Sequence, residues 1–423
     1  MSQNKQQDLE QASNWSMVGK DPWTMPLEDI DLSHPGIWQS GEFLPFLERL
    51  RRDDPVHYCP RSAVGPYWSV MKYQDIMTVD TTPQIYSSQP TVGIVDTFEE
   101  FTLPMFIAMD APKHDEQRKS VQPVVAPANL QRLESLIRER VCNILDGLPL
   151  NEEFDWVEKV SIELTTQMLA TLFDFPFEDR HKLTYWSDVA TAIPGGGVVE
   201  SQEERWQAIQ ECLACFTRLW NERVNSEPGN DLVSMLAHGE ATRNMPPMEY
   251  LGNVILLIVG GNDTTRNSIS GGVLALNENP AEYDKLRADP GLIPNMVSEI
   301  IRWQTPLAYM RRTALVDTEL GGKQIKAGDK VVMWYASGNR DEEVIDRANE
   351  FLIDRPRARQ HLSFGFGLHR CMGNRLAEMQ LRIVWEEIMQ RFHAVAVVGE
   401  PQRVYSSFVK GYTRLPVKLQ PLA

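Results

Sequence analysis

Apolar residues recur three or four positions apart over much of the chain, which is the spacing of one face of a helix. This pattern predicts helices near 35–51, 113–124, 129–148, 154–173, 201–226, 248–277, 296–303 and 374–392. Short β-rich runs predict small sheets near 56–72, 312–335 and 394–420. The expected fold class is therefore mainly α with a small β-rich part. Residues 1–35 are polar and are expected to form a loosely ordered lead, with 36–423 as a single domain.

The predicted helix over 248–277 has an unusual centre. Residues 254–259 are apolar on every side, which predicts complete burial. Directly after them stands Gly-Gly-Asn-Asp-Thr-Thr (260–265), in which the two glycines alone cost about 2 kcal/mol relative to alanine. Either another helix packs against the glycines, or the Thr264 hydroxyl bonds the carbonyl of Gly260 and opens a groove for a small ligand. Several unfavourable residues at one place favour the groove.

The loop from Ser363 to Gly373 places Cys371 immediately before a predicted helix. Its glycines allow positive φ and a close approach of the backbone to a flat ligand. Unpaired N–H groups and the helix dipole at a helix N-terminus stabilise a thiolate. Cys371 is therefore a candidate metal ligand or nucleophile, with a small buried structural cysteine as the alternative.

Charge and composition exclude some classes of protein. The net charge of −16 argues against nonspecific binding to nucleic acid, which needs cationic side chains to displace counterions. The longest apolar run, 254–259, is too short to span a bilayer. Five cysteines are few and odd in number, as is typical of a reducing compartment. We expect a cytoplasmic protein.

The cysteine loop and the residues after it, Asn374-Arg375-Leu376-Ala377, resemble the haem-binding signature of the cytochromes P450. The acid–alcohol pair Asp263-Thr264, after two small residues, resembles the oxygen-binding groove of the same family. This resemblance implies the cytochrome P450 fold, with haem b between the helix over 248–277 and the helix after the loop. It implies Cys371 as the axial metal ligand, Thr264 beside dioxygen and Asp263 in a proton relay. Further implied cofactor contacts are Gly260, Phe364, Gly365 and Gly373.

Charged residues that match family positions extend the resemblance. The implied partners of the two haem propionates are His114, Arg118, Arg312 and His369. Arg311 could exchange roles with Arg312. Glu299 and Arg302, one helical turn apart, match the family's structural ion pair, and Arg355 would be its third member. A solvated surface charge is the alternative for each of these residues.

The implied activity is monooxygenation, in which one oxygen atom of O2 enters a C–H bond and the other is reduced to water. The sequence shows no glycine-rich β–α turn of a nucleotide-binding reductase domain. Electrons from NAD(P)H are therefore expected through a separate ferredoxin reductase and ferredoxin, and the protein is expected to be a monomer.

Segments 260–268 and 361–367 are similar to the bacterial terminal alkane hydroxylases, which implies ω-hydroxylation of medium-chain alkanes or fatty acids. Candidate substrate contacts are Val95, Phe98, Leu256, Val259, Leu307, Met310 and Phe408, with core packing as the alternative for each. A terpene or steroid hydroxylase of the same fold is the nearest rival. A non-hydroxylating haem-thiolate protein and a haem gas sensor are more distant rivals.

Overall fold

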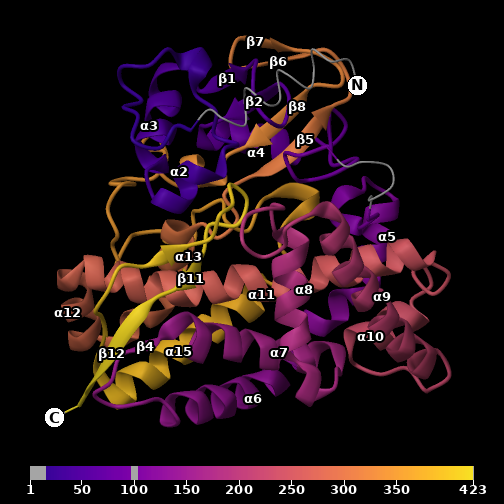
Figure 1. The fold of residues 1–423 in the computed structure, drawn as a ribbon, viewed down its shortest axis with the longest axis vertical. Helices are drawn as coiled ribbons and strands as arrows, with labels where there is room; N and C mark the ends of the chain where they lie inside the picture. The colour runs from indigo at the N-terminus through magenta and orange to yellow at the C-terminus, as the bar shows by residue number, and fades with distance from the viewer. Residues whose placement is uncertain (1–15, 97–102, 423) are drawn as a thin grey trace.

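Helices form the larger part of the molecule in the computed structural model, which describes residues 16–96 and 103–422 (Figure 1). The α-helices in these ranges are α2 (Pro35–Ser40), α3 (Phe43–Asp53), α4 (Tyr73–Thr81), α5 (Lys113–Val121), α6 (Pro127–Asp146), α7 (Glu163–Phe173), α8 (His181–Thr191), α9 (Gln202–Val224), α10 (Leu232–His238), α11 (Pro247–Glu278), α12 (Pro280–Ala288), α13 (Ile293–Gln304), α14 (Tyr335–Gly338) and α15 (Asn374–Arg391). The expected mainly α class is confirmed.

The strands form small sheets. They are β1 (Val56–Cys59), β2 (Tyr67–Val70), β3 (Tyr86–Ser87), β4 (Phe154–Asp155), β5 (Met310–Ala314), β6 (Thr318–Leu320), β7 (Lys323–Ile325), β8 (Lys330–Met333), β9 (Phe392–Val397), β10 (Gln402–Arg403), β11 (Tyr412–Arg414) and β12 (Pro416–Pro421). One sheet has the order β1-β2-β8-β5-β3, with β2 and β8 parallel, and another has the order β4-β12-β9. The pairs β6-β7 and β10-β11 complete the set in the described ranges.

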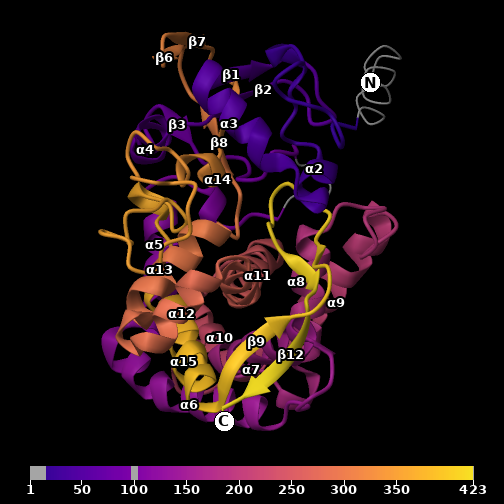
Figure 2. The same ribbon diagram turned by 90° about the vertical axis from the view of Figure 1, so that its left-hand side faces the viewer.

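Helix α11 lies at the centre of the helical part. Figure 2 looks almost down its axis and shows the other helices and the β9-β12 pair around it. Val254, Ile255 and Ile258 are buried, as the all-round apolar pattern of this segment predicts. The prediction of complete burial is wrong for residues 256, 257 and 259, which are only partly buried because they line a cavity. Because α11 packs against α7, α8, α13 and α15, its middle is held from several directions.

The five-stranded sheet lies with α3 and α4 at the end of the molecule that is uppermost in Figure 1. The expected loosely ordered lead is different in its described part, since Met17, Ile30 and Leu32 are buried in the same apolar cluster as Trp38 and Trp334. Three apolar side chains among polar neighbours are enough to fasten this segment to the sheet.

The prediction of one helix over 154–173 is wrong at its start. Phe154 and Asp155 form β4, in which Phe154 pairs with Val417 of β12, and a wide π-helical turn over 157–162 precedes α7. Helices α4, α8, α10 and α12 were not predicted. In α8 the residues Thr184, Val189 and Thr191 are poor helix formers, and packing against α11 outweighs this local preference.

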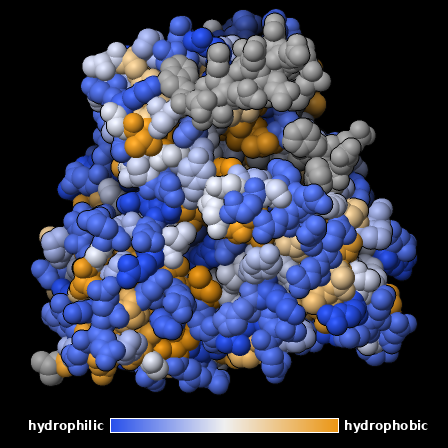
Figure 3. Space-filling view, in the orientation of Figure 1, coloured by the Kyte–Doolittle hydropathy of each residue, from blue (hydrophilic) through white to orange (hydrophobic). Residues whose placement is uncertain are grey.

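The face of the molecule in Figure 3 is mainly hydrophilic, with hydrophobic residues scattered over it. Within the described ranges, no helix combines the length and the apolar character that crossing a bilayer requires. The apolar segment of α11 packs instead in the interior of the protein.

Candidate functional site

A cavity of ≈ 870 Å³ lies between α11 and the cysteine loop. Gly260 and Thr264 line it on the α11 side, while Phe364, Gly365 and Cys371 line it on the loop side. This volume is within the range of about 300–1,000 Å³ that ligand pockets occupy. The two candidate sites that the sequence indicates, with Thr264 and Cys371 more than a hundred positions apart, therefore face the same cavity.

The backbone of the cysteine loop follows the glycine pattern. Gly365 and Gly367 both have φ +63, and a Cβ on Gly367 would lie 2.5 Å from the Asp80 carbonyl oxygen. The Cys371 N–H donates to the Phe364 carbonyl oxygen at 2.8 Å, which closes the loop just before α15 begins at Asn374. The predicted positive φ values are thus confirmed at Gly365 and Gly367, whereas Gly373 has φ −86 and needs no such freedom.

Cys371 has exposed surface although protein lies around it. Its exposed surface faces the cavity, which Cys371 lines. Burial raises the pKa of its thiol, against lowering contributions from the N–H groups of Gly373 and Asn374 and from the charges of Arg118 and Arg370. The helix N-terminus alone therefore does not produce the expected thiolate. A positive ion at the sulfur would supply the missing stabilisation.

Four cationic or imidazole side chains expected at the cofactor gather near this loop. Arg118, Arg312 and His369 line the cavity, and the buried ring of His114 lies edge-on to that of His369, with centroids 4.2 Å apart. His114 Nε2 and His369 Nδ1 have no hydrogen-bond partner among the described residues. Unpaired buried nitrogens beside two arginines fit the carboxylates of an anionic cofactor, and the Cys371 sulfur fits its metal.

Of the two adjacent arginines in β5, Arg312 lines the cavity, whereas Arg311 pairs with Asp96 at 2.7 Å. Arg312 Nη2 donates to Asp80 Oδ1 at 2.7 Å, and both side chains are buried. The position of Arg312 is therefore the one that suits a propionate partner.

Asp80, near the end of α4, was missed by the sequence reasoning. Besides Arg312 it accepts hydrogen bonds from the Phe366 N–H at 2.7 Å and from the Tyr335 hydroxyl at 3.1 Å. Burial raises the pKa of Asp80, although the Arg312 charge and the Phe366 N–H act in the opposite direction. Asp80 thereby ties the cavity arginine to the cysteine loop. A carboxylate directly after the apolar residues of α4 was the only local signal.

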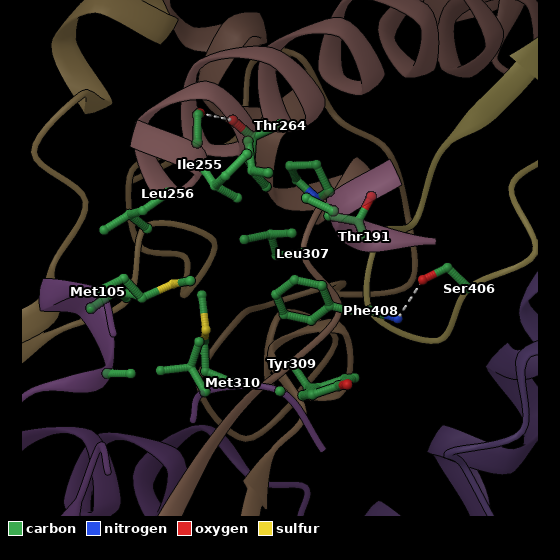
Figure 4. A pocket seen from close by; sticks show the side chains of 18 of the residues that line it. Met105, Thr191, Ile255, Leu256, Thr264, Leu307, Tyr309, Met310, Ser406 and Phe408 are labelled. Carbon is green, nitrogen blue, oxygen red and sulfur yellow. Dashed lines mark hydrogen bonds between the residues drawn. The ribbon is translucent and has the colours of Figure 1, made fainter. Parts of the chain in front are cut away.

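The two glycines of α11 have different surroundings. A Cβ on Gly260 would meet nothing within 4 Å, because this position opens into the cavity. A Cβ on Gly261 would lie 2.8 Å from Leu169 Cδ2 of α7. The Thr264 hydroxyl donates to the Gly260 carbonyl oxygen at 2.9 Å, as Figure 4 shows. The sequence offers two interpretations of these glycines. A groove is observed at Gly260, and close packing of another helix is observed at Gly261.

Asp263 is fully buried beside this groove and is held from α8. Its carboxylate accepts hydrogen bonds from Ser187 Oγ at 3.1 Å and Thr191 Oγ1 at 3.4 Å. Arg266, one turn further along α11, lies 3.0 Å from Asp263 and 2.5 Å from Asp188. Burial raises the pKa of Asp263 to about 6, with the Arg266 charge opposing this and the Asp188 charge adding to it. Asp263 can therefore gain and lose a proton near neutral pH.

Sequence reasoning singled out Asp263 but not the residues that surround it. Ser187, Asp188 and Thr191 belong to α8, which was not predicted. Arg266 had a usable signal, since a buried acid in a helix is commonly paired with a cation three or four positions away.

The expected structural ion pair is fully buried. Arg302 donates to both carboxylate oxygens of Glu299, at 2.8 and 2.7 Å, and Arg355 donates to Glu299 at 2.9 Å. The arginines also donate to main-chain oxygens of Asn339, Ala348 and Glu350. Burial would raise the pKa of Glu299, but hydrogen bonds and charges from the two arginines lower it.

The apolar residues expected at the substrate mostly share the cavity. Those that line it are Val95, Leu256, Val259, Leu307, Met310 and Phe408. Figure 4 shows Leu256, Leu307, Met310 and Phe408 projecting into one space on the Thr264 side of the pocket. Val95 is 57% exposed and lies at the rim, and Phe98 lies outside the described residues.

A cysteine sulfur on one wall, an acid–alcohol pair on the other and unpaired nitrogens at the edge form a site that suits an anionic cofactor with a metal, as in the haem-thiolate enzymes. Comparisons with known proteins agree. The cytochrome P450 family pattern matches residues 291–419, which include Glu299 and Cys371. The chain is 35% identical over 407 residues to the linalool 8-monooxygenase of Pseudomonas putida, covering 93% of this chain and 100% of that protein. The chain belongs to the cytochrome P450 family.

Two further relatives carry the comparison. The methyl-branched lipid omega-hydroxylase of Mycobacterium tuberculosis is 32% identical over 421 residues, with 94% of this chain and 96% of that protein covered. The solved structure of cytochrome P450-153 from Novosphingobium aromaticivorans is 46% identical with a TM-score of 0.87, and the alignment covers 94% of this chain and 100% of that one. The protein is thus a monooxygenase that uses haem b, O2 and electrons derived from NAD(P)H, and such bacterial enzymes typically receive their electrons from redox partner proteins.

Proposed function

We propose that this monooxygenase hydroxylates the terminal carbon of medium-chain alkanes or fatty acids. The observation that carries the proposal is the apolar wall above Cys371, formed by side chains such as Leu256, Leu307 and Phe408. Such a wall binds a flexible hydrocarbon by burial alone and offers it few polar contacts. The likeness to a methyl-branched lipid omega-hydroxylase supports hydroxylation at the end of an apolar chain.

The bound haem supplies oxygen activation, and we assign the remaining tasks to side chains of this chain. Cys371 would ligate the iron, and His114, Arg118, Arg312 and His369 would hold the two propionates. Phe364, Gly365 and Gly373 shape the loop around the cofactor. Glu299, Arg302 and Arg355 brace the chain behind this loop without touching substrate.

Proton supply is the task of the α11 groove. The open space at Gly260 leaves room for dioxygen and a water next to the Thr264 hydroxyl. Asp263 exchanges protons because its pKa lies near neutral pH. Arg266 forms ion pairs with both Asp263 and Asp188 and so holds Asp263 near a second carboxylate, whose side chain is 31% exposed. The Thr264 hydroxyl then positions dioxygen, which accepts the proton, and Asp263 supplies the proton that replaces it.

The electron donors we propose are a ferredoxin and its NAD(P)H-dependent reductase, acting on a monomeric protein. Exposed arginines around the cysteine loop, among them Arg357, Arg370 and Arg375, provide positive charge for an acidic carrier. This charge stands out because the chain as a whole is strongly acidic.

Product analysis tests the substrate assignment. The purified enzyme with a ferredoxin system is given octane and, separately, dodecanoic acid, and the positional isomers of the products are separated by gas chromatography. We expect 1-octanol and 12-hydroxydodecanoic acid as main products. Products hydroxylated solely at subterminal carbons would contradict the proposal.

A terpene hydroxylase remains the second candidate, and one observation favours it. The relative that is 35% identical is a linalool 8-monooxygenase. Linalool offered together with octane decides between the two: we expect octane to be turned over faster, and a clear preference for linalool would replace the alkane assignment.

A further inference from the structure

Arg205, at the start of α9, is a cation on the wall of an otherwise apolar part of the cavity. Its Nη2 donates to the carbonyl oxygen of Ala190 at 2.5 Å, and this is the one hydrogen bond of its side chain among the described residues. A guanidinium has five N–H donors. Most of the donors of Arg205 are therefore free to meet a molecule in the cavity.

No carboxylate of the described residues pairs with Arg205. The carboxylates that line the cavity have other partners: Asp31 accepts from Tyr67, Asp80 pairs with Arg312, and Asp96 pairs with Arg311 and Lys330. Burial lowers the pKa of Arg205, and no acid of the described residues counteracts this. A partly buried guanidinium without an anion is costly, and an anionic ligand in the cavity would offset this cost.

The other cations of the cavity are already assigned. Arg118 lies near Cys371, and a charge on the sulfur would act to raise the pKa of the Arg118 guanidinium. Arg312 pairs with Asp80. Both therefore belong to the cofactor side. Arg205 instead contacts the last turn of α8, on the side of the cavity where α8 meets α11.

A short series of contacts links Arg205 to the reaction site. The oxygen that Arg205 contacts belongs to Ala190, and the next residue, Thr191, donates to Asp263 beside Thr264. Figure 4 shows Thr191 and Met105 on opposite sides of a pocket that Leu307 and Phe408 project into. A molecule with one end at Arg205 therefore lies in the same cavity as Thr264 and Cys371, among the apolar side chains that line it.

We propose that Arg205 binds the carboxylate of a medium-chain fatty acid and so presents its methyl end to the haem. A carboxylate and a guanidinium form paired charge-assisted hydrogen bonds, which fix one end of the molecule. This inference rests on the proposed terminal hydroxylation, and it makes fatty acids, rather than alkanes, the preferred substrates. Arg205 determines specificity and takes no part in the chemistry.

The test compares dodecanoate with methyl dodecanoate, which has the same chain without the charge. Calorimetric titration of the haem-loaded enzyme is expected to give tighter binding of dodecanoate. In Arg205→Gln, which keeps a donor for the Ala190 carbonyl, the ratio of the two affinities is expected to fall by at least about tenfold. Arg205→Lys retains the charge and should keep most of the preference.

The matched control is Arg218→Gln, since Arg218 lies on the same helix but does not line the cavity. It should leave the ratio as in the wild type. Equal affinities of the wild type for the two ligands, or an unchanged ratio in Arg205→Gln, would overturn the inference. Product positions from the wild type decide the proposed function separately: terminal products with an unchanged ratio remove only the role of Arg205, and subterminal products remove the terminal assignment.

Discussion

The two sides of the cavity each have a buried carboxylate nearby, and the surroundings of the two carboxylates differ. On the cysteine side, Glu299 is buried with both carboxylate oxygens bound by arginines, and the arginines are bound in turn to main-chain oxygens. On the α11 side, Asp263 is equally buried but has a pKa near 6, and Arg266 pairs it with Asp188, whose side chain is 31% exposed. One carboxylate is locked in its charged form, and the other is poised between two forms. Burial alone therefore does not distinguish a structural carboxylate from a reactive one. The number of cationic donors around the carboxylate does.

The largest effect is expected at the cysteine itself. Cys371→Ala removes the sulfur that faces the cavity, so hydroxylation should be lost and the reduced protein with carbon monoxide should lack the red-shifted Soret band of a thiolate ligand. Cys212→Ala, a buried thiol on α9, should keep both properties. A thiolate-type band in Cys371→Ala would assign the axial ligand to another residue.

The locked carboxylate is tested by Glu299→Gln. Breaking a buried ion pair leaves two arginines without their anion, and the free energy of unfolding should fall by about 3–5 kcal/mol. The midpoint of urea denaturation measures this. Glu350→Gln disrupts an exposed pair with Arg347, whose side chains are more than half exposed, and should leave the midpoint close to that of the wild type. Equal shifts in the two variants would mean that the Glu299 network gives no special support.

The poised carboxylate is tested by Asp263→Asn. Without a group that exchanges protons, kcat should fall by about 100-fold, at the lower end of what acid–base groups contribute. Glu249→Gln changes another buried acid of α11, which pairs with Lys113 outside the cavity, and should not share this loss.

The same residue predicts a pH dependence. Because the pKa of Asp263 is raised to about 6, the carboxyl group is protonated below this pH and ionised above it. The wild-type kcat should therefore decline as the pH rises through about 6, and Asp263→Asn should lack this step. The Arg266 charge lowers the pKa of Asp263, so Arg266→Gln should move the step to higher pH. A step that persists in Asp263→Asn would belong to another group.

A smaller effect is expected from Thr264→Ala, which removes the hydroxyl over Gly260 but leaves Asp263 in place. Electrons should still be consumed, with a larger share released as hydrogen peroxide and less product formed per NAD(P)H. Ser268→Ala removes the equivalent hydroxyl one turn later, which donates to the Thr264 carbonyl oxygen at 2.8 Å, and serves as the control. Unchanged coupling in Thr264→Ala would remove this residue from the relay.

The strongest sequence patterns gave the most accurate predictions. The helix expected over 248–277 is observed as Pro247–Glu278, and the one expected over 374–392 as Asn374–Arg391. Long periodic segments have few alternatives, because their apolar faces must be buried. Helix α8 escaped prediction because its β-branched residues oppose helix formation locally, and its packing against α7, α9 and α11 stabilises it.

The sequence by itself determined the two halves of the site, the cysteine loop and the unfavourable residues in the middle of α11, because each is a local violation of helix or strand preference. Only the tertiary structure decided how they work. The partners of Asp263 stand 72 and 76 positions away in α8, and Asp80 meets Phe366 across 286 positions. Such pairings depend on how helices pack, which no local spacing encodes. Likewise, only the tertiary structure shows that Arg205 lines the cavity and has no carboxylate partner among the described residues.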